Sequence, residues 1–333
     1  MIPNTFGIQA TADSYVVIRN EAELLDFLQQ GTLLHSPFFI LGGGSNIVFT
    51  QHFRGTVLHL DNKGIQPLAD PDPDPDPDAI LIQAAAGEQW DTFVRHCIAH
   101  GWHGAENLVA IPGTVGASPV QNVGAYGVEA KDIIHSVRAL EIAMGRPRIF
   151  TNHECRFAYR NSIFKNELKD QYIVTSVTFR LHKTFRPNIG YKAVSDALAQ
   201  SGITQPTALQ LADTIAAVRW SKLPRPEQVG SAGSFFKNPI VSAEQYAGLK
   251  EQYPDMVAYP APDGYKLAAG WLIEHAGWKG RTLGRCGVYE KQALVLVNRG
   301  GCTGSEVLAL ADAITSSVQQ TYGVTLEKEA IIV

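Results

Sequence analysis

The chain has 333 residues, 45% of them hydrophobic, and a formal net charge of −4. This length and composition predict a globular protein with two or three packed domains. The acidic balance argues against nucleic-acid binding, because surfaces that bind nucleic acid neutralise phosphates with Lys and Arg. No apolar run is long enough to span a bilayer, and residues 1–5 lack the features of a signal peptide. We therefore expect a cytoplasmic monomer that binds neither nucleic acid nor a membrane.

The four cysteines are widely spaced, and no two form a Cys-x-x-Cys pair. They are Cys97, Cys155, Cys286 and Cys302. This spacing favours free thiols in a reducing cytosol over a disulfide framework.

Apolar periodicity and capping residues predict helices over 20–30, 90–100, 193–200, 207–220, 242–253, 266–276 and 305–322. Apolar runs and alternation predict strands over 37–41, 47–49, 79–84, 137–142, 149–151, 172–181, 293–298 and 324–333. Asn20 and Ser242 are the expected N-caps of their helices, and Gly31 follows the end of the first helix. On the final strand, Glu329 would face away from Val324 and Leu326.

The strand at 37–41 runs into Gly42-Gly43-Gly44-Ser45-Asn46. Backbone N–H groups in such a run form a concavity suited to a phosphate or pyrophosphate. No helical pattern follows the glycines, so this is not a Rossmann fingerprint. A tight β-turn is the alternative interpretation.

Residues 70–78 alternate Asp and Pro. The prolines favour an extended chain and the like charges repel, which predicts a solvated linker and a boundary between two packed segments. A calcium site is the alternative, but the repeat cannot fold a cage around an ion. A second boundary is expected at the prolines of 222–226.

Three histidines lie close together in the sequence, at His96, His100 and His103. The first two, His96 and His100, have the spacing of metal ligands on a helix. No acidic residue or partner cluster accompanies them, so a histidine-bearing surface is the default interpretation and no metal is expected.

Residues 111–127 form the densest glycine segment of the chain. With so little side-chain volume, the backbone can wrap closely around a flat or polyanionic ligand. A chain of plain turns is the alternative, although it would carry more charged residues. Together with 42–46, the segment suggests one large ligand held in two places.

Ser234 ends a flexible run, Gly230-Ser231-Ala232-Gly233, and precedes Phe235-Phe236-Lys237-Asn238-Pro239. A nucleophilic serine is one interpretation. The surrounding sequence is not Gly-x-Ser-x-Gly and no histidine lies nearby in the chain, which weakens it.

Six motifs occur in a fixed order along the whole chain. They are 41–46 (LGGGSN), 111–117 (IPGTVGA), 121–127 (QNVGAYG), 159–165 (YRNSIFK), 233–239 (GSFFKNP) and 326–329 (LEKE). In this order they resemble the UDP-N-acetylenolpyruvoylglucosamine reductase family of bacterial peptidoglycan synthesis. The stretch near Tyr191 resembles the type I branch, in which an extra loop closes over the substrate. The Asp-Pro repeat departs from the family pattern.

The resemblance implies an α+β fold, in which a two-lobed FAD-binding domain of the vanillyl-alcohol-oxidase (PCMH) type precedes an α/β substrate-binding domain. The expected parts are a first FAD-binding lobe (1–69), the Asp-Pro linker (70–78), a second lobe (79–220), and a substrate-binding domain (221–323). The type I insertion would occupy about 186–206 of the second lobe, and the strand 324–333 would pack back on the first lobe.

The resemblance also assigns the glycine-rich segments to non-covalently bound FAD. Gly42, Gly43, Gly44, Ser45 and Asn46 would hold the pyrophosphate with backbone N–H groups. The rest of the flavin would be lined by Ile111, Pro112, Gly113, Thr114, Gly116, Ala117, Ser118, Gln121, Asn122 and Gly124.

The implied reaction begins with hydride transfer from NADPH to FAD, and reduced flavin then passes hydride to the enolpyruvyl ether of a sugar nucleotide. Negative charge develops next to the substrate carboxylate and must be stabilised and protonated. Arg160 matches the family arginine that grips this carboxylate, and Glu329 matches a glutamate close to it. Ser234 matches the proton donor.

The diphosphate of the sugar nucleotide requires further cations and donors. The resemblance assigns this role to Tyr191, Lys222 and Asn238, places Gln292 near the carboxylate, and leaves Tyr126 and Arg219 as further contacts. A structural role is the alternative for each of them, and for Arg219 and Lys222 it is a solvated helix end.

Two other functions remain open at this point. A related FAD-dependent sugar or alcohol oxidase would share the FAD domain but have a different C-terminal third. A non-catalytic nucleotide-sugar binder would keep the fold without the activity.

Overall fold

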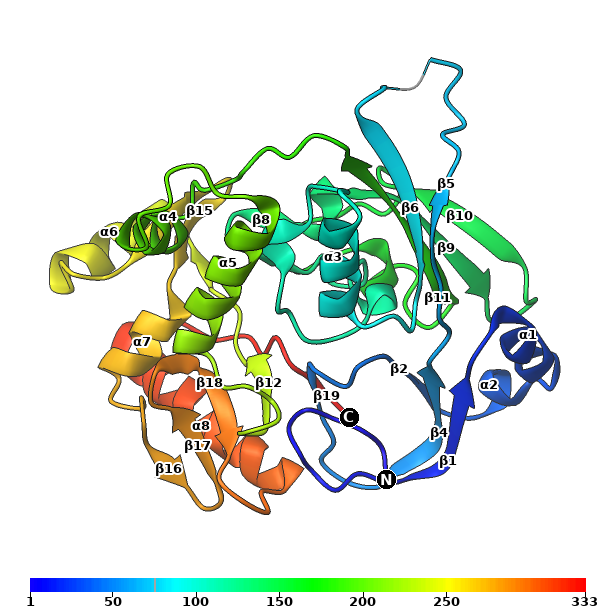
Figure 1. The fold of residues 1–333 in the computed structure, drawn as a ribbon. Coiled ribbons are helices and arrows are strands. Elements are labelled where there is room, and N and C mark those ends of the chain that lie inside the picture. Colours follow the sequence, from blue (N-terminus) through cyan, green and yellow to red (C-terminus); the bar gives the residue numbers. More distant parts are fainter. Residues whose placement is uncertain (75) are drawn as a thin grey trace. The chain divides into compact units, whose positions relative to one another are not determined.

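The computed structural model describes residues 1–74 and 76–333. The described chain divides into two compact units, each containing helices and sheets (Figure 1). Unit 1 comprises Met1–Thr11, Gly44–Phe53 and Trp220–Val333, and unit 2 comprises Ala12–Gly43 and Arg54–Arg219.

A five-stranded antiparallel sheet forms the larger part of unit 2, in the spatial order β10-β9-β11-β6-β5. Its strands are β5 (Ile65–Leu68), β6 (Ala79–Ala85), β9 (Ile134–Glu141), β10 (Pro147–Thr151) and β11 (Tyr172–His182). The central strand β11 is buried on both faces from Ile173 to Phe179 rather than on the one face that its alternation predicts. Helix α3 (Trp90–Ala99) contributes to this burial, since the rings of Phe93 and Phe179 lie 4.5 Å apart.

A smaller sheet of unit 2 has the order β1-β4-β2, from β1 (Ala12–Ile18), β2 (Phe38–Leu41) and β4 (Phe53–Leu60). Helices α1 (Glu21–Gln29) and α2 (Thr32–His35) lie beside β1 and β4 (Figure 1). The predicted cap is confirmed, because the Asn20 side chain accepts a hydrogen bond from Glu23 N at 2.9 Å. Leu24 and Leu28 share an apolar cluster with Leu58 and Leu60 of β4.

The Asp-Pro repeat connects β5 to β6, and these neighbouring strands pair with Leu68 opposite Leu81. The predicted boundary therefore does not coincide with a boundary between the compact units. A segment of prolines and mutually repelling carboxylates needs only to be exposed to solvent. The end of a hairpin provides this exposure just as a linker between domains would. Pro75, which belongs to this repeat, lies outside the described residues.

Unit 1 is built on a four-stranded antiparallel sheet with the order β12-β18-β17-β16. The strands are β12 (Ser231–Ser234), β16 (Thr282–Leu283), β17 (Cys286–Tyr289) and β18 (Gln292–Asn298). Helices α7 (Ala269–His275) and α8 (Gly304–Tyr322) share one buried apolar cluster with this sheet. Thr303 and Glu306 form a capping box at the start of α8.

The remaining helices are α4 (Lys192–Gln200), α5 (Ala208–Lys222) and α6 (Ala243–Gln252), which confirms the predictions for these regions. The other strands are β3 (Ile47–Val48), β7 (Gly124–Ala125), β8 (Val128–Glu129), β13 (Ile240–Val241), β14 (Ala258–Ala261), β15 (Gly264–Leu267) and β19 (Ile331–Ile332). Four 3-10 turns, η1 (Glu106–Leu108), η2 (Val115–Ala117), η3 (Ala130–Asp132) and η4 (Ile163–Lys165), complete the elements. None of the described helices has both the length and the apolar character needed to cross a membrane.

Two predicted elements are wrong in part. The helix expected over 266–276 begins only at Ala269, because Lys266 pairs with Ile240 and Tyr259 as part of β15. The strand expected over 324–333 is reduced to β19, which pairs in parallel with β3. Glu329 therefore lies in an irregular segment rather than on one face of a strand.

The prediction of four free thiols is also wrong. Cys286, the first residue of β17, forms a disulfide with Cys302, which lies just before α8, and their Cα atoms are 5.6 Å apart. Cys97 and Cys155 are buried free cysteines. Burial raises the pKa of Cys155 to about 12, and it also raises the pKa of Cys97. The two partners are 16 residues apart in sequence, so only the fold reveals that they meet.

We predict that denatured, unreduced protein exposes two reactive thiols and that reduced protein exposes four. Reduction should lower the free energy of unfolding by about 3 kcal/mol, as expected for a closed loop of this size. Thiol titration and urea unfolding measure the two effects. As a control, reductant should not change the stability of the Cys286→Ala/Cys302→Ala variant. Four thiols before reduction would contradict the disulfide.

Candidate active-site residues

Within unit 2, Gly42 and Gly43 of the first glycine-rich segment lie against Gly113 and Thr114 of the second. A Cβ atom on Gly43 would come within 2.9 Å of Gly113 Cα, and one on Gly42 within 2.5 Å of Thr114 Oγ1. Real side chains do not tolerate such approaches, so these positions require glycine. Strand β2 leads into Gly42, and Trp90 N donates to Gly113 O at 3.0 Å. The segments predicted to hold one ligand are thus adjacent.

The 3-10 turn η2 is fixed on the end of β6. Gly116 N donates to Ala86 O at 2.8 Å, and a Cβ on Gly116 would lie 2.5 Å from the Ala86 Cβ. The side chains of Thr114 and Ser118 are buried, and Ser118 Oγ donates to Val115 O at 2.7 Å. A ligand beside this turn would therefore meet mainly backbone groups.

One polar atom of this region is buried and lacks a hydrogen-bond partner among the described residues. It is Oε1 of Gln121, a predicted cofactor-binding residue. A buried acceptor normally has a partner, and an N–H group of a bound ligand would supply one. Together with the close glycine contacts, this atom fits a large flat cofactor with hydrogen-bonding edges such as FAD.

Asn122 is fully buried and uses its side chain within the protein. Its Nδ2 donates to Glu129 Oε2 at 3.1 Å and to Ala158 O at 3.0 Å, and its Oδ1 accepts from Lys131 N at 2.9 Å. The side chain thus ties the glycine-rich segment to the turn that precedes Arg160. Its contact with the cofactor stays a prediction.

Arg160 has a left-handed backbone, with φ of 53°. Its Nη2 donates to Gly124 O at 3.2 Å, and its guanidinium lies 5.3 Å from the centre of the Tyr159 ring. Asn122 (φ 46°) and Tyr126 (φ 50°) are also left-handed. A positive φ is strained for residues other than glycine, and such strain is concentrated at functional sites. Three predicted site residues share it.

Tyr126 and Tyr191 meet edge to face, with ring centres 5.2 Å apart. Burial raises the pKa of Tyr126, and the nearby charge of Arg219 partly opposes that rise. Burial lowers the pKa of Arg219, and the charge of Arg160 lowers it further. Unit 2 therefore brings two mutually repelling guanidinium groups together with two phenol rings, and the charge of Asp91 offsets part of the repulsion at Arg219.

In unit 1, Ser234 is the last residue of β12 and pairs with Val295 of β18. Gly233 has a φ of 68°, which favours glycine there. The rings of Phe235 and Phe236 are buried 5.3 Å apart and fix the backbone after Ser234 in the core. Ser234 itself is only partly buried.

Hydrogen bonds hold the C-terminal segment beside the residues that follow Ser234. Glu329 N donates to Phe235 O at 2.8 Å, and Lys237 N donates to Glu327 O at 2.9 Å. Asn46 Nδ2 donates to Glu329 O at 3.2 Å. The predicted residues Asn46, Ser234 and Glu329 thus belong to one region of unit 1.

Three further predicted residues have separate surroundings in unit 1. Asn238 Oδ1 accepts from Ala269 N at the start of α7 at 3.0 Å, which leaves the amide NH₂ as the group that would donate to an anion. Gln292 Oε1 accepts from Leu294 N at 3.3 Å. Lys222 is exposed at the last residue of α5.

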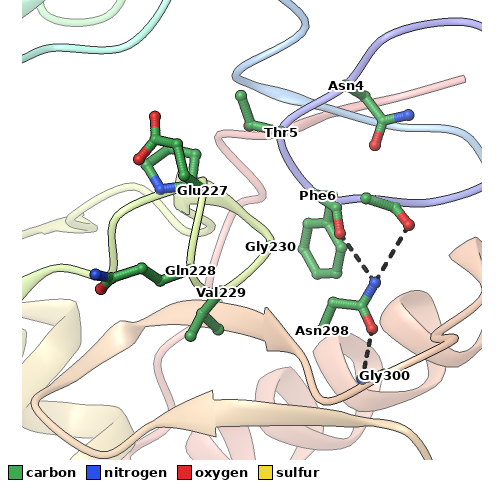
Figure 2. Close-up of a pocket in the computed structure, with 11 residues that line it drawn as sticks. Asn4, Thr5, Phe6, Glu227, Gln228, Val229, Gly230, Asn298 and Gly300 are labelled. Atoms are coloured by element: carbon green, nitrogen blue, oxygen red, sulfur yellow. Dashed lines mark hydrogen bonds between the residues drawn. The ribbon is translucent and has the colours of Figure 1, made fainter.

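A pocket of about 340 Å³ also lies in unit 1 (Figure 2). Residues 4–7, residues 226–230, Asn298 and Gly300 line it. Asn298 Nδ2 donates to Phe6 O at 3.0 Å and Gly300 N donates to Asn298 Oδ1 at 2.9 Å, so this side chain is used to fix the wall. The lining includes no predicted site residue, and we assign no function to the pocket.

Comparisons with known proteins identify the family. Residues 225–333 match the UDP-N-acetylenolpyruvoylglucosamine reductase C-terminal domain, and residues 12–150 match an FAD binding domain. The chain is 47% identical to the UDP-N-acetylenolpyruvoylglucosamine reductase of Paraburkholderia phytofirmans, over 98% of this chain and 94% of the relative. It belongs to the UDP-N-acetylenolpyruvoylglucosamine reductase family.

A relative from Neisseria gonorrhoeae with the same name is 46% identical over 98% of this chain and 93% of its own length. The crystal structure of UDP-N-acetylenolpyruvylglucosamine reductase (MurB) from Thermus caldophilus superposes with a TM-score of 0.63 at 22% identity, covering 99% of this chain and 95% of that chain. The α+β fold that the motifs implied, with an FAD-binding domain, is confirmed.

Sequence reasoning missed one residue that the structure connects to this reductase region. Asn107 is buried in η1, and its side chain donates to Tyr126 O at 3.0 Å. An isolated asparagine in a short 3-10 turn has no periodic pattern or motif that would reveal it.

We predict that Gly43→Ala prevents FAD binding, because the added Cβ would collide with the backbone of Gly113, which cannot shift as a flexible side chain can. The purified variant should be colourless, as judged by its visible flavin absorbance. Gly248→Ala is the matched control, since no atom lies within 4 Å of its added Cβ, and it should keep the flavin. A yellow Gly43→Ala protein with normal flavin content would contradict the prediction.

Proposed function

We propose that the residues assigned above carry out the reductase reaction in this chain. As a family member, the protein is an FAD-dependent NADPH oxidoreductase that reduces UDP-N-acetylglucosamine enolpyruvate to UDP-N-acetylmuramate in peptidoglycan synthesis. The match of residues 225–333 to the reductase C-terminal domain argues against the alternative of a sugar or alcohol oxidase.

The observation that best supports these residue roles is the strained Arg160, whose guanidinium donates to Gly124 O at 3.2 Å and repels the nearby buried guanidinium of Arg219. Two like charges near each other cost free energy, and a bound anion offsets that cost. The substrate offers a carboxylate and a diphosphate. A guanidinium grips a carboxylate with two parallel hydrogen bonds, which suits Arg160 to the carboxylate.

FAD, when bound, accepts hydride from NADPH and supplies it to the vinyl methylene carbon of the substrate. The neighbouring carbon then carries negative charge that is shared with the carboxylate. Arg160 stabilises this charge through its hydrogen bonds to the carboxylate oxygens. Glu329 lies near the carboxylate in the proposed arrangement and, in its protonated form, donates a further hydrogen bond.

Ser234 completes the reaction by donating its hydroxyl proton to the negatively charged carbon, and water returns the proton to the serine oxygen. A serine hydroxyl is a weak acid in water, so this role depends on a fixed geometry. The position of Ser234 between the β12–β18 pairing and the buried Phe235 supports such a geometry.

The other assigned residues bind the substrate or FAD. Tyr191, Lys222 and Asn238 bind the diphosphate, Gln292 lies near the carboxylate, and Tyr126 and Arg219 provide further contacts. For FAD, residues 42–46 offer backbone N–H groups to the pyrophosphate and residues 111–124 line the remainder. The division into FAD-binding lobes (1–69 and 79–220) and a substrate-binding domain (221–323) is part of this proposal.

The proposal also includes a cytoplasmic monomer that works without nucleic acid or a membrane. The net charge of −4 supports the absence of nucleic-acid binding. Phosphate-binding surfaces for nucleic acid depend on an excess of Lys and Arg.

We predict that Ser234→Ala leaves flavin reduction by NADPH nearly unchanged and slows flavin reoxidation by the enolpyruvyl substrate by at least about 100-fold, as expected for loss of a general acid. Stopped-flow absorbance separates the two half-reactions. Ser231→Ala, in the same strand, is the matched control and should alter neither. Equal slowing of both half-reactions by Ser234→Ala would refute the assignment, and wild-type enzyme that does not reoxidise with this substrate would refute the function.

Lys222→Ala should weaken substrate binding by about 10-fold, through loss of a charge-assisted hydrogen bond to the diphosphate. The rate of reoxidation at saturating substrate should change little. Titration of the substrate against the flavin spectrum measures the affinity. Lys169→Ala removes the same charge from another exposed position and should have no effect. A loss confined to the saturated rate would be inconsistent with a binding role.

A further inference from the structure

A buried asparagine connects the two segments of unit 2 that carry Tyr126 and Tyr191. Asn107 is 3% exposed. Its Nδ2 donates one hydrogen bond to Tyr126 O and another to Asn188 O, both at 3.0 Å. The side-chain amide of Asn107 therefore donates one hydrogen bond to each of two segments that are far apart in the sequence.

The turn that carries Asn107 is itself firmly held. Glu106 Oε1 pairs with His103 Nδ1 at 2.9 Å, and its Oε2 accepts from Gly104 N at 2.7 Å. On the other side, Nε1 of the buried Trp90 donates to Leu108 O at 2.8 Å. Because both neighbours of Asn107 are fixed, its side chain is a rigid point of attachment.

The two attached segments need such a support. Tyr126 has a left-handed backbone, which is strained for a tyrosine. The other segment lies at the surface, where Ile189 is 38% exposed and Tyr191 is 46% exposed. Little apolar burial holds this segment, so a hydrogen bond from a rigid buried side chain matters more there. The edge-to-face contact of Tyr126 and Tyr191 then depends on both attachments.

We propose that Asn107 is a positioning residue for substrate binding. It fixes the backbone at Tyr126 and Asn188 in the arrangement in which the rings of Tyr126 and Tyr191 meet. Both amide hydrogens are used within the protein, so Asn107 does not act by touching the substrate. The inference rests on the proposed role of Tyr191 in binding the diphosphate.

This role makes specific chemical demands. One NH₂ group supplies two donors at a fixed angle, and neither a carboxylate nor an alkyl group reproduces them. Asn107→Leu keeps a similar volume and removes both donors. Asn107→Ser is a milder variant that keeps a polar group but cannot reach both carbonyl oxygens. Without these two hydrogen bonds, holding the two segments in this arrangement costs more free energy on binding, which lowers affinity rather than the rate of the bound complex.

We expect Asn107→Leu to weaken substrate binding by about 10-fold, the effect of losing roughly one hydrogen bond. Flavin reduction by NADPH should be unchanged, and reoxidation at saturating substrate should change by less than about 3-fold. Asn107→Ser should follow the same pattern, and it replaces Asn107→Leu in this test if the leucine variant does not fold. Unchanged affinity in a folded variant, or a loss only in the saturated rate, would overturn the proposal.

Asn152 is the matched control. Its Nδ2 also donates to two backbone carbonyls of unit 2, Lys131 O at 2.8 Å and Ile134 O at 2.7 Å, but neither belongs to a segment assigned to the substrate. Asn152→Leu should lower stability to an extent similar to Asn107→Leu and leave substrate affinity unchanged. An equal loss of affinity in both variants would show general damage and overturn the proposal.

A double-mutant cycle with Tyr191→Ala tests whether Asn107 acts through Tyr191. We expect Tyr191→Ala to weaken binding less in the Asn107→Leu background than in the wild type. Fully additive effects would overturn the proposal. If Tyr191→Ala alone leaves the affinity unchanged, the assigned role of Tyr191 fails. Amide hydrogen exchange over 186–192 then still decides whether Asn107 holds the segment, since exchange should be faster in Asn107→Leu and equal exchange would overturn the attachment.

Discussion

Unit 2 depends on the close approach of Gly42 and Gly43 to Gly113 and Thr114, at distances that no side chain would permit. This contact joins the end of β2 to the segment before η2, which is itself held by Ala86 at the end of β6. Because β2 and β6 belong to different sheets, the contact sets where the two sheets of this unit meet. The same absence of side chains exposes backbone groups to a ligand. Packing and the proposed cofactor binding would therefore place the same demand on these glycines.

Near this contact, the hydrogen bonds of buried asparagine side chains stabilise a backbone whose left-handed residues are strained. Each left-handed residue among Asn122, Tyr126 and Arg160 costs about 1–3 kcal/mol. The side-chain hydrogen bonds of Asn122 and Asn107, at about 1 kcal/mol each, oppose that cost. Two of them end on or close to a left-handed residue, at Tyr126 O and at Ala158 O, which lies two residues before Arg160. The strain is thus offset locally, which explains why polar side chains occupy buried positions there.

The parts of this structure that depend on local sequence were predictable. The Asn20 and Ser242 caps are observed, as are most of the helices and strands with clear periodicity. The incorrect predictions concern positions whose structure is determined by residues that are distant in the sequence. Residues 324–330 have the composition of a strand, but their hydrogen bonds go to isolated partners such as Phe235 and Asn46. Lys266 was assigned to a helix because its pairing with Ile240 is not visible locally. Cys286 and Cys302 meet only because β17 begins near the start of α8. The site motifs were recognisable, but Asn107 was not, since its function depends on where its two donors point.

Ser234 shows why the support of a residue matters as much as its chemistry. Its hydroxyl is an ordinary one, and no neighbouring histidine or lysine needs to make it more acidic for the proposed role. What the structure supplies is restraint: pairing with Val295 on one side, two fully buried rings immediately after it, and a carboxyl-bearing segment hydrogen-bonded to Phe235. A weak acid protonates a carbanion-like carbon efficiently when the distance is right, because the carbon is a far stronger base than water. In the proposed reaction, the acidity of the serine would therefore matter less than the rigidity of the backbone that carries it.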